Sequence, residues 1–381
     1  MKMLVLGAGL QGSACAFDLL QDPEVTEVRL VDRSHDHLPV FLAKAGPRLK
    51  LVALDVRDPA AVVAQMRECD AVQSAVPYYF NGDLAEWAVE AGVHFCDLGG
   101  NTEIVSRQKR LDSAASAKQI SVMPDCGLAP GMVNVLAEHG IRQLDRVDSV
   151  KIFVGGLPQH PEPPLNYQIV YSLEGVLDYY TTLSWVLRGG RRTQVKALSE
   201  REPVVFPPPL GTLEAFHTAG GLSTMAFRYE GKIPTMEYKT LRYPGHALIM
   251  EAVRDLGFLD QEAVEVKGQQ VVPRDLAVVT MGRRLTKPGS EDLVALRVIV
   301  RGTKNGAAAS RAWELVDRYD PAIGMSAMER TTGYSLSITG LMQARRQVGA
   351  MGVHTPDEAM PPAAYIAELA KRGVAIREIS V

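Results

Sequence analysis

A glycine-rich turn near the start of the chain is followed, one strand later, by an acidic residue. Gly7, Gly9 and Gly12 come directly after an apolar run, and Asp32 ends a second apolar run twenty residues beyond Gly12. In this pattern the first glycine permits a tight turn, the second lets backbone approach a pyrophosphate, and the third lets helix and strand pack closely. The helix N-terminus binds phosphate through its free N–H groups. Asp32 is placed to accept hydrogen bonds from ribose hydroxyls and to repel a 2′-phosphate, so the motif predicts dinucleotide binding with NAD favoured over NADP.

Further residues near this turn and at later strand ends complete the predicted cofactor site. Arg33 weakens the preference for NAD slightly, because a guanidinium can pair with a 2′-phosphate. Asp55 follows the third predicted strand, where it would lie beside the adenine or, alternatively, act only as an exposed helix cap. The small side chains at 75–77 would let a nicotinamide lie close to the backbone. The alternative is an ordinary strand end that binds nothing, which would have the same residue types. The predicted cofactor-binding residues are Gly7, Gly9, Leu10, Gln11, Gly12, Asp32, Arg33, Asp55, Val56, Ala75, Val76, Pro77, Leu98, Gly99 and Asn101.

Two later glycine turns carry carboxylates. The run Asp97-Leu-Gly-Gly-Asn101 exposes backbone between two polar side chains. The run Asp125-Cys-Gly-Leu-Ala-Pro-Gly131 combines a carboxylate with two glycines and a proline, which suits a rigid corner between cofactor and substrate. Asp125 is therefore a candidate general base. The alternative is a structural hinge in which Asp125 caps the following helix.

Charged and aromatic groups gather in the second half of the chain, in the run Lys239-Thr-Leu-Arg-Tyr-Pro-Gly-His246. Two cations, a phenol and an imidazole at a predicted strand-to-helix turn suit a substrate carboxylate, which Arg242 would hold through two parallel hydrogen bonds. Lys239, His246 and, further upstream, His217 are candidate catalytic bases. Single histidines are often structural, so that interpretation stays open for both.

These residues require elements that bring them together. The first 125 residues alternate strands and helices in the manner of a parallel, doubly wound sheet. Ligands of such a sheet bind beyond the carboxyl ends of its strands, which is where Asp55, Pro77, Asp97 and Asp125 are predicted to lie. After the first strand, we expect strands at 27–31, 50–54, 71–76, 93–98 and 120–124, and helices at 13–20, 38–45, 59–68, 83–91 and 106–118.

From about residue 133 the pattern changes to long alternating strands with a few helices, which predicts a second domain of α+β type. Strands are expected at 147–154, 166–171, 235–243, 293–302 and 310–319, and helices at 173–187, 246–256 and 273–284. The chain then returns to helices at 327–349 and 362–372 and a final strand at 374–379. The predicted division is a dinucleotide-binding domain at 1–130, a substrate and oligomerisation domain at 131–325, and a C-terminal segment at 326–381 that packs back on the first domain.

Length and composition narrow the class of protein. The 381 residues suffice for about two domains, and 46% hydrophobic with 22% charged residues is ordinary for a globular protein. A net charge of −3 with no run of basic residues longer than two argues against nucleic-acid or membrane partners. No apolar run is long enough to span a membrane, and the first strand begins too early for a signal peptide. The four cysteines lack metal-type spacing, so we expect reduced thiols, no metal and a cytoplasmic location.

Several of these motifs together resemble those of the saccharopine dehydrogenase superfamily, and most closely its lysine 6-dehydrogenase branch. The resemblance runs nearly end to end, through the closing runs 352–358 and 369–373, and the runs at 125–131 and 239–246 are far more specific than the glycine turn. The motifs that carry it are Gly7–Gly12, Asp97–Asn101, Asp125–Gly131, Gly155–Gln159, Tyr171–Gly175 and Lys239–His246.

The resemblance implies an enzyme that oxidises the ε-amine of L-lysine with NAD, releasing ammonia and a semialdehyde that cyclises. The extended strands of the second domain would suit the interface of a homodimer or higher homo-oligomer. Saccharopine-forming members carry a basic residue where this chain has Glu174, and a carboxylate there favours an amino group over the glutamate half of saccharopine. The implied roles are Arg242 for the α-carboxylate and Glu174 for the α-ammonium, with Tyr171 and Tyr243 as further substrate-binding residues. Asp125 and Lys239 rank ahead of the two histidines as the base, because their motifs are the more specific.

Other functions remain open at this stage. A saccharopine or carboxyspermidine-type imine reductase would share the same motifs, although a diamine substrate would not need Arg242. A non-catalytic NAD-binding sensor is a third interpretation, and it would bind NAD tightly without turning over any amine. An assay of NADH production with lysine alone separates these alternatives.

Overall fold

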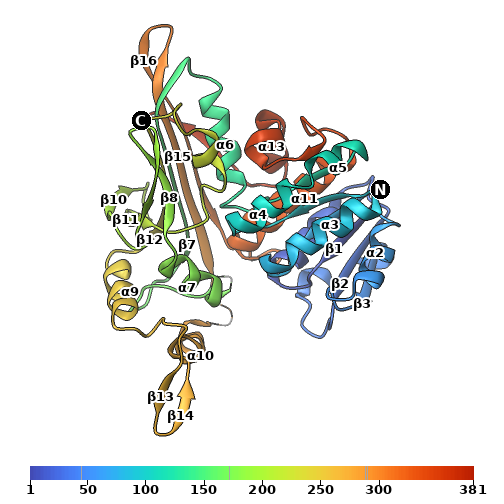
Figure 1. The fold of residues 1–381 in the computed structure, drawn as a ribbon, viewed down its shortest axis with the longest axis horizontal. Coiled ribbons are helices and arrows are strands. Elements are labelled where there is room, and N and C mark those ends of the chain that lie inside the picture. The colour runs from blue at the N-terminus through green and yellow to red at the C-terminus, as the bar shows by residue number, and fades with distance from the viewer. Residues whose placement is uncertain (44, 171, 288, 290) are drawn as a thin grey trace. The chain divides into compact units, whose positions relative to one another are not determined.

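The computed structural model describes residues 1–43, 45–170, 172–287, 289 and 291–381 (Figure 1). The chain divides into two compact units. The first comprises Met1–Asp145, Ser223–Met225 and Asp320–Glu378, and the second comprises Arg146–Leu222, Ala226–Tyr319 and Ile379–Val381. The division differs from the predicted boundary at residue 131, because the buried helix α6 (Met132–Ile141) belongs to the first unit and packs against two C-terminal helices of that unit.

The first unit is built on a parallel sheet, as predicted. Its strands follow the order β17-β6-β5-β4-β1-β2-β3, and each neighbouring pair is parallel. β1 lies between β4 and β2, so the strands that follow it along the chain extend the sheet first in one direction and then in the other. Such parallel sheets bind ligands at this switch point, beyond the carboxyl ends of the strands. The strands are β1 (Lys2–Leu6), β2 (Glu27–Asp32), β3 (Leu49–Ala53), β4 (Ala71–Ser74), β5 (His94–Asp97), β6 (Ser121–Met123) and β17 (Gly352–Val353).

Helices connect and cover these strands. They are α1 (Leu10–Gln21), α2 (Pro59–Met66), α3 (Asn81–Ala91), α4 (Thr102–Lys109), α5 (Asp112–Ala117), α6, α11 (Ala327–Ala344), α12 (Pro356–Ala359) and α13 (Pro362–Lys371). The single helix expected at 106–118 is wrong, because two shorter helices, α4 and α5, take its place. Asn101 caps α4 at an earlier start, and a hydrogen bond from the Arg110 N–H to the Arg107 carbonyl oxygen ends α4 before α5 begins. The helix expected at 38–45 is also wrong, because its described residues form a short 3₁₀ turn at Val40–Leu42, and a second such turn follows at Gly46–Arg48. Gly46 and Pro47 are poor helix formers, and they limit the stretch to a length at which an α-helix is marginal.

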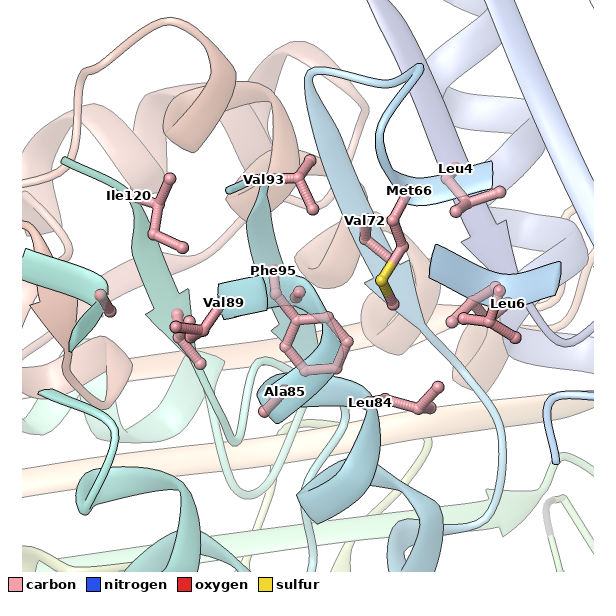
Figure 2. Close-up of a cluster of buried hydrophobic side chains, with 14 of the residues drawn as sticks. Leu4, Leu6, Met66, Val72, Leu84, Ala85, Val89, Val93, Phe95 and Ile120 are labelled. Carbon is pink, nitrogen blue, oxygen red and sulfur yellow. The ribbon is translucent and has the colours of Figure 1, made fainter. Parts of the chain in front are cut away.

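The core of the first unit lies on both faces of the sheet. On one face, alternate strand residues pack against α2 and α3, as Figure 2 shows for Leu4, Leu6, Met66, Val72, Leu84 and Phe95. On the other face, α1 packs against α11 at close range, because Gly333 leaves no side chain between them and a Cβ there would lie 2.6 Å from Ala14. Both faces are therefore covered, as a parallel sheet requires.

The second unit holds a mixed sheet with long antiparallel strands, which confirms the predicted α+β type. Its strands run in the order β10-β11-β12-β7-β15-β16, with β8 paired to both β12 and β9. The bounds are β7 (Arg146–Pro158), β8 (Ser184–Arg188), β9 (Arg191–Val195), β10 (Glu202–Val205), β11 (Thr212–His217), β12 (Thr235–Arg242), β15 (Asp292–Lys304), β16 (Ala307–Arg318) and the terminal β18 (Arg377–Ile379).

Helices of the second unit lie mainly on one side of its sheet. They are α7 (Leu173–Thr181), α8 (Met225–Arg228), α9 (His246–Asp255) and α10 (Pro273–Leu285), with a small hairpin of β13 (Val264–Val266) and β14 (Gln269–Val271) beyond (Figure 1). The helix expected at 173–187 is wrong beyond Thr181, because the aromatic and β-branched residues Trp185 and Val186 enter β8 instead. The strand expected at 166–171 is not formed by its described residues, where Asn166 has a positive φ of 49°.

Within the described residues, no helix is both long enough and apolar enough to cross a bilayer.

Candidate active site

A cavity of about 400 Å³ opens beyond the carboxyl ends of β1, β2, β3 and β4 in the first unit. Nine of the predicted cofactor residues line it: Gly7, Gly9, Asp32, Arg33, Asp55, Val56, Ala75, Val76 and Pro77. Five further residues line it that the sequence analysis missed: Val31, Leu54, Arg57, Tyr79 and Phe80. Two features of the sequence could have identified some of these residues. An aromatic run follows Pro77 directly, and Arg57 stands two residues after Asp55.

The glycines shape this cavity through backbone conformation and close packing. Gly7 has a φ of +98°, which residues with a Cβ rarely adopt. A Cβ at Gly12 would collide with the Gly7 carbonyl oxygen, so α1 can begin directly against the turn only with glycine at that position. Leu10 opens α1, and the helix therefore presents its N-terminus beside the turn. This arrangement fits the pyrophosphate of a dinucleotide.

Asp32 ties the glycine turn to the end of β2. One carboxylate oxygen accepts the N–H of Ala8 at 2.7 Å, and the other accepts the N–H of Arg33, also at 2.7 Å. The side chain is therefore held at the edge of the cavity by backbone donors. A carboxylate in this place suits ribose hydroxyls and disfavours a 2′-phosphate.

Asp55 and Arg57 form a second charged feature of the same cavity. The Arg57 guanidinium donates to both Asp55 oxygens, with an Nη2–Oδ2 distance of 2.6 Å and an Nε–Oδ1 distance of 3.0 Å. These hydrogen bonds lower the pKa of Asp55 to about 2. The carboxylate is thus ionised at any working pH, and Arg57, its partner cation, lines the same cavity.

The remaining predicted cofactor residues lie outside the lining of the cavity. They are Leu10, Gln11, Gly12, Leu98, Gly99 and Asn101. Gly12 lies in α1 against the glycine turn, where the absence of a side chain lets the helix approach the Gly7 carbonyl group. Asn101 caps α4, since its side-chain oxygen accepts the N–H groups of Glu103 and Ile104. Gly99 lies against Asp125, at a neighbouring site on the same edge of the sheet.

That neighbouring site contains two buried carboxyl groups. Asp97 ends β5 with none of its surface exposed, and Asp125 follows β6 with 2% exposed. Gly100 donates its N–H to Asp125 at 3.1 Å, and the Ser223 hydroxyl donates to the other Asp125 oxygen. A Cβ at Gly99 would collide with the Asp125 carboxylate, which explains the glycine.

Burial shifts the acidity of both carboxyl groups. It raises the pKa of Asp97 to about 6, against the opposing hydrogen bonds from Gln108 and the Gly99 N–H. It raises the pKa of Asp125 to about 7, with a further contribution from the nearby charge of Asp97 and an opposing one from the Ser223 hydroxyl. A carboxylate whose pKa lies near neutral pH is suited to accept a proton in a reaction, because general bases work best when their pKa is close to the working pH.

The run 239–246 is split by the geometry of β12 in the second unit. Lys239 and Arg242 stand three positions apart, and side chains alternate along a strand, so the two cations lie on opposite faces of the sheet. Lys239 shares its face with His217, which is its register partner on β11. The Lys239 ammonium donates to Glu202 and to the Glu200 carbonyl oxygen, each at 2.6 Å. The single constellation expected from sequence is therefore two separate clusters.

Arg242 and His246 belong to the second cluster, among buried aromatic rings. The Arg242 guanidinium lies over the Tyr167 ring, 4.7 Å from its centre, and only 2% of Arg242 is exposed. His246 begins α9, with Nδ1 donating to the Leu165 carbonyl oxygen and Nε2 accepting from the Tyr180 hydroxyl. Burial, aided by the charge of Arg242, lowers the pKa of His246 to about 3.

These contacts argue against His246 as a base. Both ring nitrogens are engaged, and an imidazole of such low pKa is neutral at pH 7 and a poor acceptor of a second proton. The structural interpretation kept open for His246 is thus the better one, because its ring also lies parallel to that of Phe216, with an interplanar angle of 5° and 6.2 Å between the ring centres.

His217 and Lys239 lie beside a charged hollow of the second unit, where three potential metal ligands converge. These are Glu200, His217 and Glu237, whose donor atoms lie within 4.8 Å of one another. However, the terminal Nη2 of Arg188 lies 2.7 Å from each carboxylate and 3.4 Å from the imidazole. The guanidinium of the chain itself therefore takes the central position that a cation would occupy. His217 and Lys239 are both engaged in this network, which gives each of them a structural role independent of catalysis.

The predicted substrate residues of the second unit have varied surroundings. Glu174 is exposed in the first turn of α7, where its backbone carbonyl accepts from Arg274. The Tyr243 hydroxyl donates to the Pro158 carbonyl oxygen at 2.9 Å. Tyr171 lies outside the described residues.

The fold and the glycine-lined cavity define a nucleotide-binding protein with a separate mixed-sheet unit. Family models match almost the entire chain: one described as the saccharopine dehydrogenase NADP binding domain covers residues 3–123, and one described as the saccharopine dehydrogenase C-terminal domain covers residues 127–374. The chain belongs to the saccharopine dehydrogenase family.

Curated relatives carry the same family name. The NADP(+)-dependent, L-glutamate-forming saccharopine dehydrogenase of Schizosaccharomyces pombe is 27% identical over 275 residues, which cover 69% of this chain and 59% of that enzyme. The corresponding enzyme of Saccharomyces cerevisiae is 24% identical over 306 residues, which cover 77% of this chain and 66% of that enzyme. The matched stretch therefore spans less than two thirds of each relative.

Solved structures share the fold. Apo saccharopine dehydrogenase (L-Glu forming) from Saccharomyces cerevisiae matches with a TM-score of 0.80 and 19% identity, over 100% of both chains. The homospermidine synthase of Legionella pneumophila, solved in complex with NAD, matches with a TM-score of 0.71 and 12% identity, over 100% of this chain and 91% of that one. Likeness at such identity concerns the fold alone.

Proposed function

We propose that this protein is an NAD-dependent dehydrogenase that oxidises the ε-amine of L-lysine. The net reaction consumes lysine as its ε-ammonium, NAD⁺ and water and yields the 6-semialdehyde, NADH, ammonium and one proton. Family membership supports chemistry between a nicotinamide and an amino-acid amine. The observation that carries the proposal is the pairing, along one edge of a parallel sheet, of a glycine-lined cavity with the buried Asp125.

Residues of the first unit would hold the cofactor. Gly7 and Gly9, with the N-terminus of α1, suit the pyrophosphate, and Asp32 suits the adenosine ribose. A bound nicotinamide would supply the hydride acceptor. The choice of NAD over NADP rests on the Asp32 carboxylate, which would repel a 2′-phosphate, and Arg33 on the same cavity is the residue that acts against it.

Asp125 would accept the proton of the substrate ε-ammonium. A lysine ammonium has a pKa near 10.4, so its deprotonation at pH 7 costs roughly 4–5 kcal/mol. A buried carboxylate would accept that proton, and exclusion of water would also favour the neutral amine. Asp125 stands ahead of the other candidates, since Lys239 is ion-paired with Glu202, the His217 ring is engaged by Arg188 and the Tyr238 carbonyl, and His246 is held neutral.

Roles for the substrate's other groups are proposed from residue type. Arg242 would bind the α-carboxylate and Glu174 the α-ammonium, with Tyr243 as a further contact. Glu174 is the residue that favours lysine, because saccharopine would bring an additional carboxylate. We also propose a homo-oligomeric assembly through the second unit, which size-exclusion chromatography with light scattering would test.

A spectrophotometric screen tests the proposal directly. Lysine, ornithine, saccharopine and diamines are each assayed with NAD and with NADP. We expect reduction of NAD with lysine alone, and a rate that rises steeply from pH 7 to pH 10, because the neutral amine is the reactive form. No turnover of lysine, or a flat pH profile, would overturn the assignment.

An NADP-dependent saccharopine dehydrogenase is the second candidate. The names of the curated relatives favour it, since they are L-glutamate-forming enzymes that use NADP(+). Turnover of saccharopine with NADP, in the absence of turnover with lysine, would establish this alternative.

A further inference from the structure

Three residues from the middle of the chain are built into the first unit. The segment Ser223–Met225 belongs to this unit, although the chain before and after it belongs to the second. Met225 is fully buried, and its sulfur accepts a hydrogen bond from Asn134 at 3.4 Å. The Thr224 hydroxyl lies 3.5 Å from that of Thr355. The third contact is the hydrogen bond from the Ser223 hydroxyl to Asp125.

Both partners of this hydrogen bond have a strained backbone. Asp125 has a φ of +65° and Ser223 a φ of +53°, in the left-handed region that non-glycine residues seldom enter. Conformations of this kind collect at sites whose geometry is functionally constrained, although aspartate adopts them more readily than most residues. The hydrogen bond joins two such positions that are 98 residues apart in the chain.

The surroundings of the Asp125 carboxylate leave it few stabilising partners. Gly100 donates its N–H to one oxygen, and Ser223 donates to the other. The charged groups that face Asp125 from neighbouring elements are Asp97 at the end of β5 and Asp357 in α12, and both disfavour its ionised form. Ser223 therefore offers the side-chain hydrogen bond that opposes burial and the two neighbouring carboxyls.

We infer that Ser223 is a positioning residue for Asp125: its hydroxyl orients the carboxylate and keeps it ionised, so that Asp125 can take the proton from the substrate amine. This inference rests on the proposed function for the reaction itself. Ser223 acts through Asp125 and exchanges no proton with the substrate. Loss of a hydrogen bond to a charged group shifts the pKa of that group by about one to two units.

The test compares S223A, S223G and wild type by the pH dependence of kcat/KM for lysine. Removing the hydroxyl disfavours the ionised carboxylate, so the acidic limb of S223A should move upward by about one pH unit. S223G also lacks the hydroxyl but suits the positive φ, so its limb should move by the same amount, which separates the loss of the hydrogen bond from backbone strain. T224V is the matched control, because it removes a hydroxyl from the same segment without touching Asp125, and its limb should stay in place.

A second measurement reads Asp125 without any turnover. The carbonyl stretch of the protonated carboxyl is followed by infrared difference spectroscopy across pH, and D125N identifies the band. The midpoint should be higher in S223A than in wild type and T224V. An unchanged midpoint and an unchanged limb in S223A would overturn the inference, as would an equal shift in T224V. If wild type fails to oxidise lysine while the infrared shift occurs, the proposed function fails and the Ser223–Asp125 coupling stands.

Discussion

Lys239 and Arg242 lie on the same strand and face opposite sides of its sheet. Lys239 donates to Glu202 in a charged network, whereas Arg242 covers the ring of Tyr167 in an aromatic cluster. The two cations therefore cannot share one task. Lys239 serves the network around Arg188, and the carboxylate role is proposed for Arg242 alone.

Loss of Arg242 should weaken lysine binding selectively. We expect R242A to raise the KM for lysine at least tenfold and to change the KM for NAD by less than twofold, because a bidentate ion pair with the substrate is lost. R242K should recover only part of the loss, since an ammonium cannot form the two parallel bonds. Steady-state kinetics with both substrates varied provides the measurement.

K239M is the matched control for that experiment. It removes a cation of the same strand from the opposite face, and we expect it to lower the melting temperature while leaving the KM for lysine within twofold. An equal rise in the KM values for lysine and NAD in R242A would remove the carboxylate role.

Asp125 should make stability depend on pH. Its folded pKa of about 7 lies above the ordinary value of 3.8, so the folded state holds the proton more tightly than the unfolded state. The stabilisation is complete below about pH 4 and is lost as pH rises through 7, at about 1.4 kcal/mol per pH unit within that window. D125N lacks this ionisable group. The difference between the unfolding free energies of D125N and wild type should therefore change in favour of D125N as the pH rises from 4.5 to 7.5.

Urea denaturation at several pH values measures this difference. D36N, which alters an exposed aspartate of the same unit, serves as the control and should follow wild type. Parallel pH profiles for D125N and wild type would show that Asp125 has no raised pKa, and the case for it as the base would weaken accordingly.

Removal of Arg188 should create a metal site. The Nδ1 of His217 donates to the Tyr238 carbonyl oxygen, so Nε2 presents a lone pair toward the carboxylates of Glu200 and Glu237. Without the guanidinium between them, these three groups match the ligands that zinc takes in proteins. Isothermal titration should show R188A binding Zn²⁺ at least tenfold more tightly than wild type.

The double variant R188A/H217Q should lose that gain, because one of the three ligands is gone. If wild type binds Zn²⁺ as tightly as R188A, the guanidinium does not occupy the site in the manner described.

Asp32 should determine the choice of cofactor. We expect D32A to weaken NAD binding about tenfold, since both a ribose acceptor and the anchor of the Ala8 N–H are lost. Binding of NADP should improve relative to NAD, because Arg33 then faces a 2′-phosphate without a neighbouring carboxylate. Fluorescence titration of both reduced cofactors, with D36A as a charge-matched control, measures the ratio, and an unchanged ratio would contradict the role of Asp32.

Prediction from sequence was most successful where short-range patterns decide the structure. The glycine turn follows β1 and Asp32 ends β2, as their spacing predicts, and nine of the residues proposed for the cofactor line the cavity beside them. It was least successful at 173–187, where helical periodicity and strand propensity compete and the pairing of β8 with β12 decides the outcome. Tyr79 and Arg57 were missed because lining a cavity depends on neighbours from other strands.

The amino-acid sequence by itself determined the parallel first sheet, the nucleotide turn and the family, because these depend on local spacing and on runs of specific residues. Only the tertiary structure separated Lys239 from Arg242, placed Arg188 among three potential metal ligands, and engaged both nitrogens of His246. It also brought Ser223 to Asp125 across 98 residues. Such contacts come from packing between distant segments, and packing sets the burial and hydrogen bonding that decide which ionisable group can act as a base.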